Sequence, residues 1–99
     1  MRQVMVRYRV KPERVADNER LVSAVYDELK ALDPDGFHYA TFKLDDGVSF
    51  MHLSFSEGER PPLPDLETFR RFQQGIEERC DEPPVVTRLG EVGSFHMAS

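Results

Sequence analysis

The chain has 99 residues, with 39% hydrophobic and 31% charged residues and a formal net charge of -5 at pH 7. This composition is typical of one soluble globular domain, and it excludes an intrinsically disordered chain. The negative charge argues against nucleic acid as a partner, because phosphate contacts need a basic face. No apolar run approaches the roughly 18 residues of a membrane span, and no signal-peptide core follows the N-terminus. We therefore expect a cytoplasmic protein that does not bind membranes.

The first predicted element is a strand, followed by a long helix. Residues 4 to 10 alternate between Val4, Val6, Tyr8 and Val10 on one side and Met5, Arg7 and Arg9 on the other. A period of two is typical of a strand with one apolar face. Pro12 then suits the first turn of a helix over residues 13 to 32. Its apolar stripe contains one polar residue, Asn18, which we expect to be hydrogen-bonded within the protein.

A hairpin is predicted next, after a turn at residues 33 to 36. Two aromatic-rich strands over residues 37–44 and 48–55 flank Asp46-Gly47, a strong signal for a two-residue type I′ turn. That turn places His52 on the side of Tyr39 and Thr41. A three-residue loop instead moves His52 to the side of Ala40 and Phe42. The two-residue turn is preferred because it yields one nearly all-apolar face.

The remaining sequence predicts a second helix and a last strand. The helix is expected from about Pro64 to Arg79, with its end set by the "DEPP" stretch at residues 81–84. Cys80 continues the apolar stripe of this helix, so we expect it in the core. A final extended segment, residues 85–97, is interrupted at Gly90 and Gly93.

This order of elements, β-α-β-β-α-β, predicts an α+β fold for the single domain spanning residues 1–99. It is the ferredoxin-like plait, a four-stranded antiparallel sheet with two helices on one face. The open face of that sheet is expected to be too aromatic for contact with water alone. We therefore predict a homodimer in which a second copy covers this face.

The length, the order of elements and the aromatic hairpin resemble the antibiotic-biosynthesis-monooxygenase-like proteins of the dimeric α/β-barrel superfamily. The resemblance rests on pattern rather than on a diagnostic motif. It implies a sheet-paired dimer, a cavity between sheet and helices, and cofactor-independent oxidation of a small aromatic or quinol substrate. The haem-degrading branch of that superfamily is expected to carry a tryptophan and a histidine on the second helix. This chain has no Trp, and residues 64–80 contain no His.

For such an oxygenase, we predict His52 as the general base and Arg7, with Arg9 as the alternative, as the cation that holds a phenolate. The predicted substrate-binding residues are Tyr8, Tyr39, His38 and Phe69. No metal or other cofactor is expected, because His38, His52 and His96 lack ligand spacing and Cys80 stands alone.

Two other functions remain open at this point. A non-catalytic dimeric module that binds a small ligand explains the same features, with His52 as an ordinary hydrogen-bonded residue. An RNA-recognition module shares the order of elements, but residues 46–53 begin with Asp46 where a basic residue is wanted. The acidic net charge also disfavours RNA.

Overall fold

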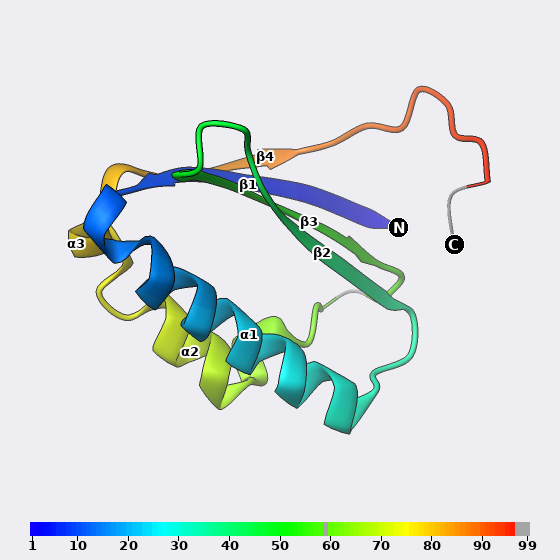
Figure 1. Ribbon diagram of the computed structural model, residues 1–99. Coiled ribbons are helices and arrows are strands. Elements are labelled where there is room, and N and C mark those ends of the chain that lie inside the picture. Colours follow the sequence, from blue (N-terminus) through cyan, green and yellow to red (C-terminus); the bar gives the residue numbers. More distant parts are fainter. Residues whose placement is uncertain (59, 97–99) are drawn as a thin grey trace.

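The computed structural model describes residues 1–58 and 60–96. Its elements are β1 (Arg2–Val10), the 3-10 turn η1 (Pro12–Arg14), α1 (Val15–Leu32), β2 (Phe37–Lys43), β3 (Ser49–Ser56), the 3-10 turn η2 (Leu63–Asp65), α2 (Glu67–Gln73), α3 (Ile76–Arg79) and β4 (Cys80–Arg88). The strands form one antiparallel sheet in the order β2-β3-β1-β4. The helices α1, α2 and α3 lie on the same side of this sheet (Figure 1). The predicted ferredoxin-like plait is confirmed.

The core lies between the sheet and the helices. The predicted alternation in β1 is seen, since Tyr8 and Val10 are buried while Arg7 is exposed. These side chains pack with Phe50 of β3 and with apolar residues of α1 and α2, among them Val25, Leu29, Leu66 and Phe72. Burial of such side chains contributes roughly 1.5–3 kcal/mol each to the stability of the fold.

Helix α2 is held to α1 at both of its ends. At its N-terminal end, the Glu28 carboxylate of α1 accepts hydrogen bonds from the Thr68 backbone N–H, at 3.1 Å, and from the Thr68 hydroxyl, at 2.5 Å. At its C-terminal end, the Arg79 guanidinium donates to the carbonyl oxygens of Phe72, at 2.8 Å, and Gln74, at 3.3 Å. Arg79 also contacts Asn18 of α1. These contacts fix the position of α2 beneath the sheet.

The β2–β3 hairpin has the predicted facing but not the predicted turn. Thr41 pairs with His52, and Phe42 pairs with Met51, as the preferred register requires. The connection, however, is a four-residue loop closed by the hydrogen bond from the Leu44 N–H to the Ser49 carbonyl. Gly47 has a positive φ of 76°, and Asp46 does not. The type I′ turn was wrong because the Asp46 carboxylate accepts hydrogen bonds from the N–H groups of residues 48 and 49, which stabilises a different loop.

The second helix is shorter than predicted. It breaks after Gln73 into α2 and α3, with Gly75 at a φ of 73° between them. Glycine reaches this left-handed conformation without the steric cost that other residues incur. Arg79, the last residue of α3, is buried and contacts Asn18 of α1.

The last strand begins earlier than predicted. Residues 81–84 lie inside β4, which pairs with β1, and residues 89–96 form no strand. The register shifts opposite Tyr8, where Pro83 and Pro84 create a bulge. Because β4 is an edge strand, two prolines at a bulge cost the sheet few hydrogen bonds. Residue 97, the end of the predicted strand, is outside the described residues.

Candidate functional site

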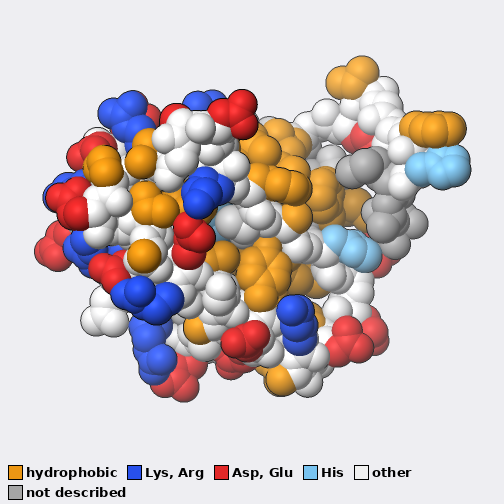
Figure 2. All heavy atoms as spheres, in the orientation of Figure 1, with side chains coloured by type: hydrophobic (Ala, Val, Ile, Leu, Met, Phe, Trp, Pro, Cys, Tyr) orange, Lys and Arg blue, Asp and Glu red, His pale blue; other side chains and the backbone are white. Residues whose placement is uncertain are grey.

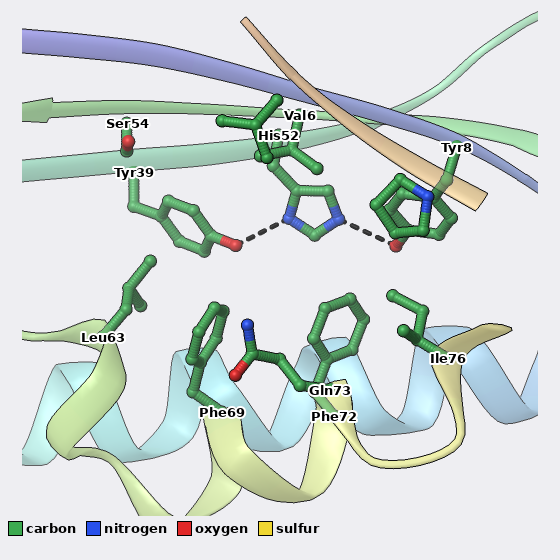
Figure 3. Close-up of a pocket in the computed structure, with 12 residues that line it drawn as sticks. Val6, Tyr8, Tyr39, His52, Ser54, Leu63, Phe69, Phe72, Gln73 and Ile76 are labelled. Carbon is green, nitrogen blue, oxygen red and sulfur yellow. Dashed lines mark hydrogen bonds between the residues drawn. The ribbon is translucent and has the colours of Figure 1, made fainter.

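A cavity of about 310 Å³ lies between the sheet and the second helical segment. Its lining is mostly apolar and aromatic, with the polar tips of a few side chains (Figure 3): Val6, Tyr8, Tyr39, His52, Ser54, Leu63, Phe69, Phe72, Gln73, Ile76, Pro84 and Val86. A cavity of about 150 Å³ is sufficient for benzene, so this one has room for a two-ring molecule. Apolar walls with a few placed polar groups are typical of small-molecule sites.

Three of the polar side chains of the cavity come from neighbouring strands. Tyr39 lies on β2, His52 on β3 and Tyr8 on β1, and all three side chains point toward the helices (Figure 3). The alternation of strand residues places them on one face, because His52 pairs with Thr41 on one side and with Val6 on the other. Phe69 and Phe72 reach up from α2 and face them.

His52 is hydrogen-bonded through both nitrogens of its ring. Its Nε2 lies 2.8 Å from the Tyr8 hydroxyl oxygen. Its Nδ1 lies 2.6 Å from the Tyr39 hydroxyl oxygen and 3.0 Å from the Thr41 hydroxyl oxygen. The Thr41 oxygen is in turn 2.8 Å from the hydroxyl of Tyr26. Both ring nitrogens of His52 therefore have hydrogen-bond partners within the protein.

Burial keeps these groups neutral. It lowers the pKa of His52 to about 4, and only 4% of this residue is exposed. Burial also raises the pKa values of Tyr8 and Tyr39 well above that of a free phenol. Desolvation disfavours the charged form of each group, which is cationic for histidine and anionic for tyrosine. At pH 7 the site thus holds a neutral imidazole between two neutral phenols.

A buried cation, the Arg79 guanidinium, is linked to Tyr8 and His52 through Asn18 of α1. Asn18, with no exposed surface, donates from Nδ2 to the Tyr8 hydroxyl at 2.9 Å. The Nε of Arg79 donates to the Asn18 Oδ1 at 3.3 Å, and the guanidinium stacks over the Phe72 ring at 5.3 Å from its centroid. The expectation that Asn18 has protein partners is confirmed.

The structure brings four of the six predicted site residues to this cavity. Tyr8, Tyr39, His52 and Phe69 line it, whereas Arg7 and His38 do not. Each of these two immediately precedes a cavity residue in its strand, and consecutive strand residues point to opposite faces of a sheet. Arg7 pairs with Met51 and Val85 on the open face, so within one chain it cannot hold a phenolate beside His52.

Sequence reasoning did not assign several residues of the site, among them Arg79 and Gln73. Arg79 was read as the end of a helix, although it follows Ile76 by three positions on the buried stripe. Gln73, which lines the cavity, carried no signal that distinguishes it from a solvated glutamine. Cys80 is buried as predicted, and burial raises the pKa of its thiol. A raised pKa disfavours the thiolate, which is the nucleophilic form.

Within residues 1–58 and 60–96, no group of three or more His, Cys, Asp or Glu side chains is arranged to hold a metal ion. In the same ranges, no helix is both long and apolar enough to cross a membrane.

No family model matches the sequence, and no curated protein matches it either. Solved structures do match the fold. The protein Rv0793 from Mycobacterium tuberculosis is 16% identical, with a TM-score of 0.74 over 94% of this chain and 96% of that one. An antibiotic biosynthesis monooxygenase is 18% identical, with a TM-score of 0.72 over 94% of this chain and all of that one.

A third solved structure, a candidate antibiotic biosynthesis monooxygenase from Nitrosomonas europaea, is 11% identical. Its TM-score is 0.76, over 94% of this chain and all of that one. The match spans nearly the full length of both chains in all three cases, so it covers the sheet, the helices and the cavity between them. This chain therefore has the fold of the antibiotic-biosynthesis-monooxygenase-like proteins that its sequence resembles.

Proposed function

We propose that this protein is a cofactor-independent monooxygenase that acts on a small aromatic or quinol substrate. The observation that carries the proposal is the hydrogen-bonded set Tyr39–His52–Tyr8 at the wall of an otherwise apolar cavity of about 310 Å³. The names of two solved structures with the same fold support it. Fold likeness alone does not establish activity, so the site carries the argument.

The proposed reaction needs an electron-rich aromatic anion and O₂. One oxygen atom enters an unsubstituted ring carbon of the phenolate and the other leaves as water. A phenol and O₂ thus give a quinone and water, with the four electrons supplied by the substrate. Phe69 and Phe72 exclude water from the substrate ring, and the Tyr39 hydroxyl binds the substrate oxygen. This assignment needs no electron carrier from the protein.

His52 is proposed to act through Tyr39 rather than directly on the substrate. A ring with a pKa of about 4 is a weak base toward a phenol, and both of its nitrogens are engaged. Its role in this proposal is to hold the Tyr39 hydroxyl at the cavity wall. Substrates that ionise or enolise readily are therefore favoured over simple phenols.

Replacing His52 with alanine is expected to lower catalysed oxygen uptake by about 100-fold or more, the usual size of a lost positioning or proton-transfer group. An oxygen electrode with 1,3-naphthalenediol, which enolises readily, measures this in the presence of a metal chelator. Formation of one naphthoquinone per O₂ consumed identifies the reaction. The exposed His96 provides the matched control, His96→Ala, which should keep full activity. Uptake that is unchanged in His52→Ala would contradict the role of His52.

A second function, a non-catalytic module that binds a small aromatic ligand, is favoured by one observation. Every hydrogen-bonding atom of His52 is already satisfied by a protein group, as expected for a structural residue. The same assay separates the two functions. Saturable binding of 1,3-naphthalenediol without oxygen uptake would support the binding module over the enzyme.

We also propose that the protein forms a homodimer through the open face of its sheet. By strand alternation, this face carries Met51, Leu53 and Phe55 of β3, with Phe42 and Val85 on either side. Phe42 is 51% and Val85 is 62% exposed. In Figure 2, apolar side chains form a patch near the middle of the view, whereas charged side chains crowd its left part and lower edge. Large exposed apolar patches are typical of interaction sites.

Phe42→Glu is expected to convert the dimer to a monomer, since a charge placed opposite apolar side chains is desolvated without a partner. Light scattering after size-exclusion chromatography measures the mass. Leu32→Glu is the control, because Leu32 is 61% exposed at the end of α1, away from the open face. A wild-type protein that elutes as a monomer at every concentration would overturn the dimer.

A further inference from the structure

We propose that Arg79 and Asn18 fix the direction of the hydrogen bonds through Tyr8 and His52, so that Tyr39 donates its phenolic proton into the cavity. The ligand must then present an oxygen acceptor at that point. The favoured class is a ketone, quinone, enolate or phenolate rather than a neutral phenol that donates. This inference deepens the proposed function in one respect, because it needs a ligand in the cavity, but it does not depend on catalysis.

The first link is set by the charge of Arg79. A guanidinium has five N–H donors and no acceptor, and it stays protonated in proteins. Its Nε therefore donates to Asn18, at 3.3 Å, and the atom of the Asn18 amide that accepts must be Oδ1. This fixes the amide orientation, and the Nδ2 donor group of Asn18 faces Tyr8.

The second link follows from the proton count at the Tyr8 hydroxyl. Its oxygen accepts from the Asn18 Nδ2 at 2.9 Å. Tyr8 is 2% exposed, so its own proton needs a protein acceptor. Within the described part of the chain, the remaining partner of this hydroxyl is the Nε2 of His52, at 2.8 Å. Tyr8 thus donates to Nε2, which must be the unprotonated nitrogen.

The third link places a proton on the opposite nitrogen of the ring. A neutral imidazole with an unprotonated Nε2 carries its hydrogen on Nδ1. Nδ1 then donates to the hydroxyl oxygens at 2.6 Å, in Tyr39, and at 3.0 Å, in Thr41. The Tyr39 oxygen is an acceptor in this bond. Its own O–H is not used in this bond. The Thr41 hydroxyl is a neighbouring acceptor for that proton, and a ligand oxygen in the cavity, which Tyr39 lines, takes its place (Figure 3).

The charge balance of the region favours the same class of ligand. Arg79 is 2% exposed, and its hydrogen-bond partners are the carbonyl oxygens of Phe72 and Gln74 and the amide of Asn18. No carboxylate of the described residues forms an ion pair with it. Every hydrogen bond in the series from Arg79 to Tyr39 is donated in the direction of Tyr39. This series of hydrogen bonds is therefore polarised so that it favours a partial negative charge on the ligand.

The direction of the hydrogen bonds from Arg79 to Tyr39 is tested by the tautomer of His52. Nitrogen-15 NMR of the wild-type protein should show a protonated Nδ1 and an unprotonated Nε2. Asn18→Asp is the reversing variant, because a carboxylate of the same shape accepts from both Arg79 and Tyr8. Tyr8 then no longer donates to His52, and the proton should move to Nε2. A protonated Nε2 in the wild-type protein would overturn the proposal, even if the variant does not fold.

The class of ligand is tested with a matched pair of two-ring probes, 1-tetralone and tetralin, which differ by one carbonyl oxygen. The wild-type protein should bind 1-tetralone about five- to tenfold more tightly, as expected for one added hydrogen bond in an apolar site. Tyr39→Phe should remove this preference without changing the His52 tautomer, and Asn18→Asp should remove it too. Equal binding of both probes by the wild-type protein would refute the donor role of Tyr39. Failure of both probes to bind would refute a cavity that takes such ligands, and with it the proposed function, while the NMR result still decides the direction of the chain.

Discussion

Arg79→Ala is expected to lower the free energy of unfolding by about 4 kcal/mol, because two buried acceptors and one partly buried acceptor lose their donor at once. These are the carbonyl oxygens of Phe72 and Gln74 and the side-chain oxygen of Asn18. Each unsatisfied buried acceptor costs roughly 1–3 kcal/mol, and water that enters the space recovers part of that. The carbonyl oxygens end α2, so the loss should loosen the floor of the cavity as well.

Urea unfolding followed by circular dichroism measures this effect. Arg79→Lys should fall between wild type and alanine, since an ammonium keeps the charge but not the fork of donors. Arg71→Ala is the matched control: Arg71 pairs with Glu67 on the exposed side of α2, and such pairs contribute about 0.5 kcal/mol or less. Equal loss in Arg79→Ala and Arg71→Ala would show that Arg79 is not a structural link between α1 and α2.

The second large effect is a loss of stability in mild acid that is due to His52. Its pKa is about 4 in the folded protein, below the ordinary value of 6.5 that applies in the unfolded chain. Between these two values the unfolded chain binds the proton and the folded protein does not, so acid favours unfolding. Stability is therefore full above about pH 6.5 and falls by about 3 kcal/mol as the pH drops to 4.

The contribution of His52 is isolated by comparison with His52→Gln, which cannot titrate in this range. The free energy of unfolding is measured with urea at pH 7, 6, 5 and 4. It should depend less steeply on pH in the variant, so that the difference in stability between wild type and variant shrinks toward pH 4. His96→Gln, at an exposed position, serves as the control substitution. Parallel stability curves for wild type and His52→Gln would contradict a buried neutral His52.

The elements that alternate strictly were predictable from sequence. Val4, Val6, Tyr8 and Val10 identify both the strand and its buried face, because a period of two leaves one arrangement that keeps apolar groups from water. The same reasoning placed His52 with Tyr39 and Thr41, since a shift by one residue reverses every side chain of a strand. Three of the cavity residues, Tyr39, His52 and Ser54, follow from that register alone.

The local breaks were not predictable, because side-chain hydrogen bonds and backbone conformation set them. Asp46-Gly47 indicates a type I′ turn, but the Asp46 carboxylate bonds to the backbone after it and selects a longer loop. Gly75 is as compatible with a continuing helix as with a break, at a cost of about 1 kcal/mol. Pro83 and Pro84 read as the end of a helix, yet they lie at a bulge of an edge strand.

The part of the site behind the cavity was the least accessible to sequence reasoning. An arginine is nearly always at the surface, so Arg79 at the end of a helix predicts a solvated side chain. Its burial depends on the break at Gly75 and on the carbonyl oxygens that the break exposes. Arg7 shows the opposite error, since chemistry suggested a cation near His52 while strand alternation places it on the other face.

The central claim is that the aromatic cavity between sheet and helices is the ligand site. Titration of the ¹⁵N-labelled protein with 1-tetralone, followed by amide chemical shifts, tests it most directly. The predicted result is a saturable shift confined to the cavity, at Tyr39, His52, Phe69 and Phe72. Shifts confined to Met51, Leu53 and Phe55 on the open face of the sheet, or no saturable shift, would contradict it.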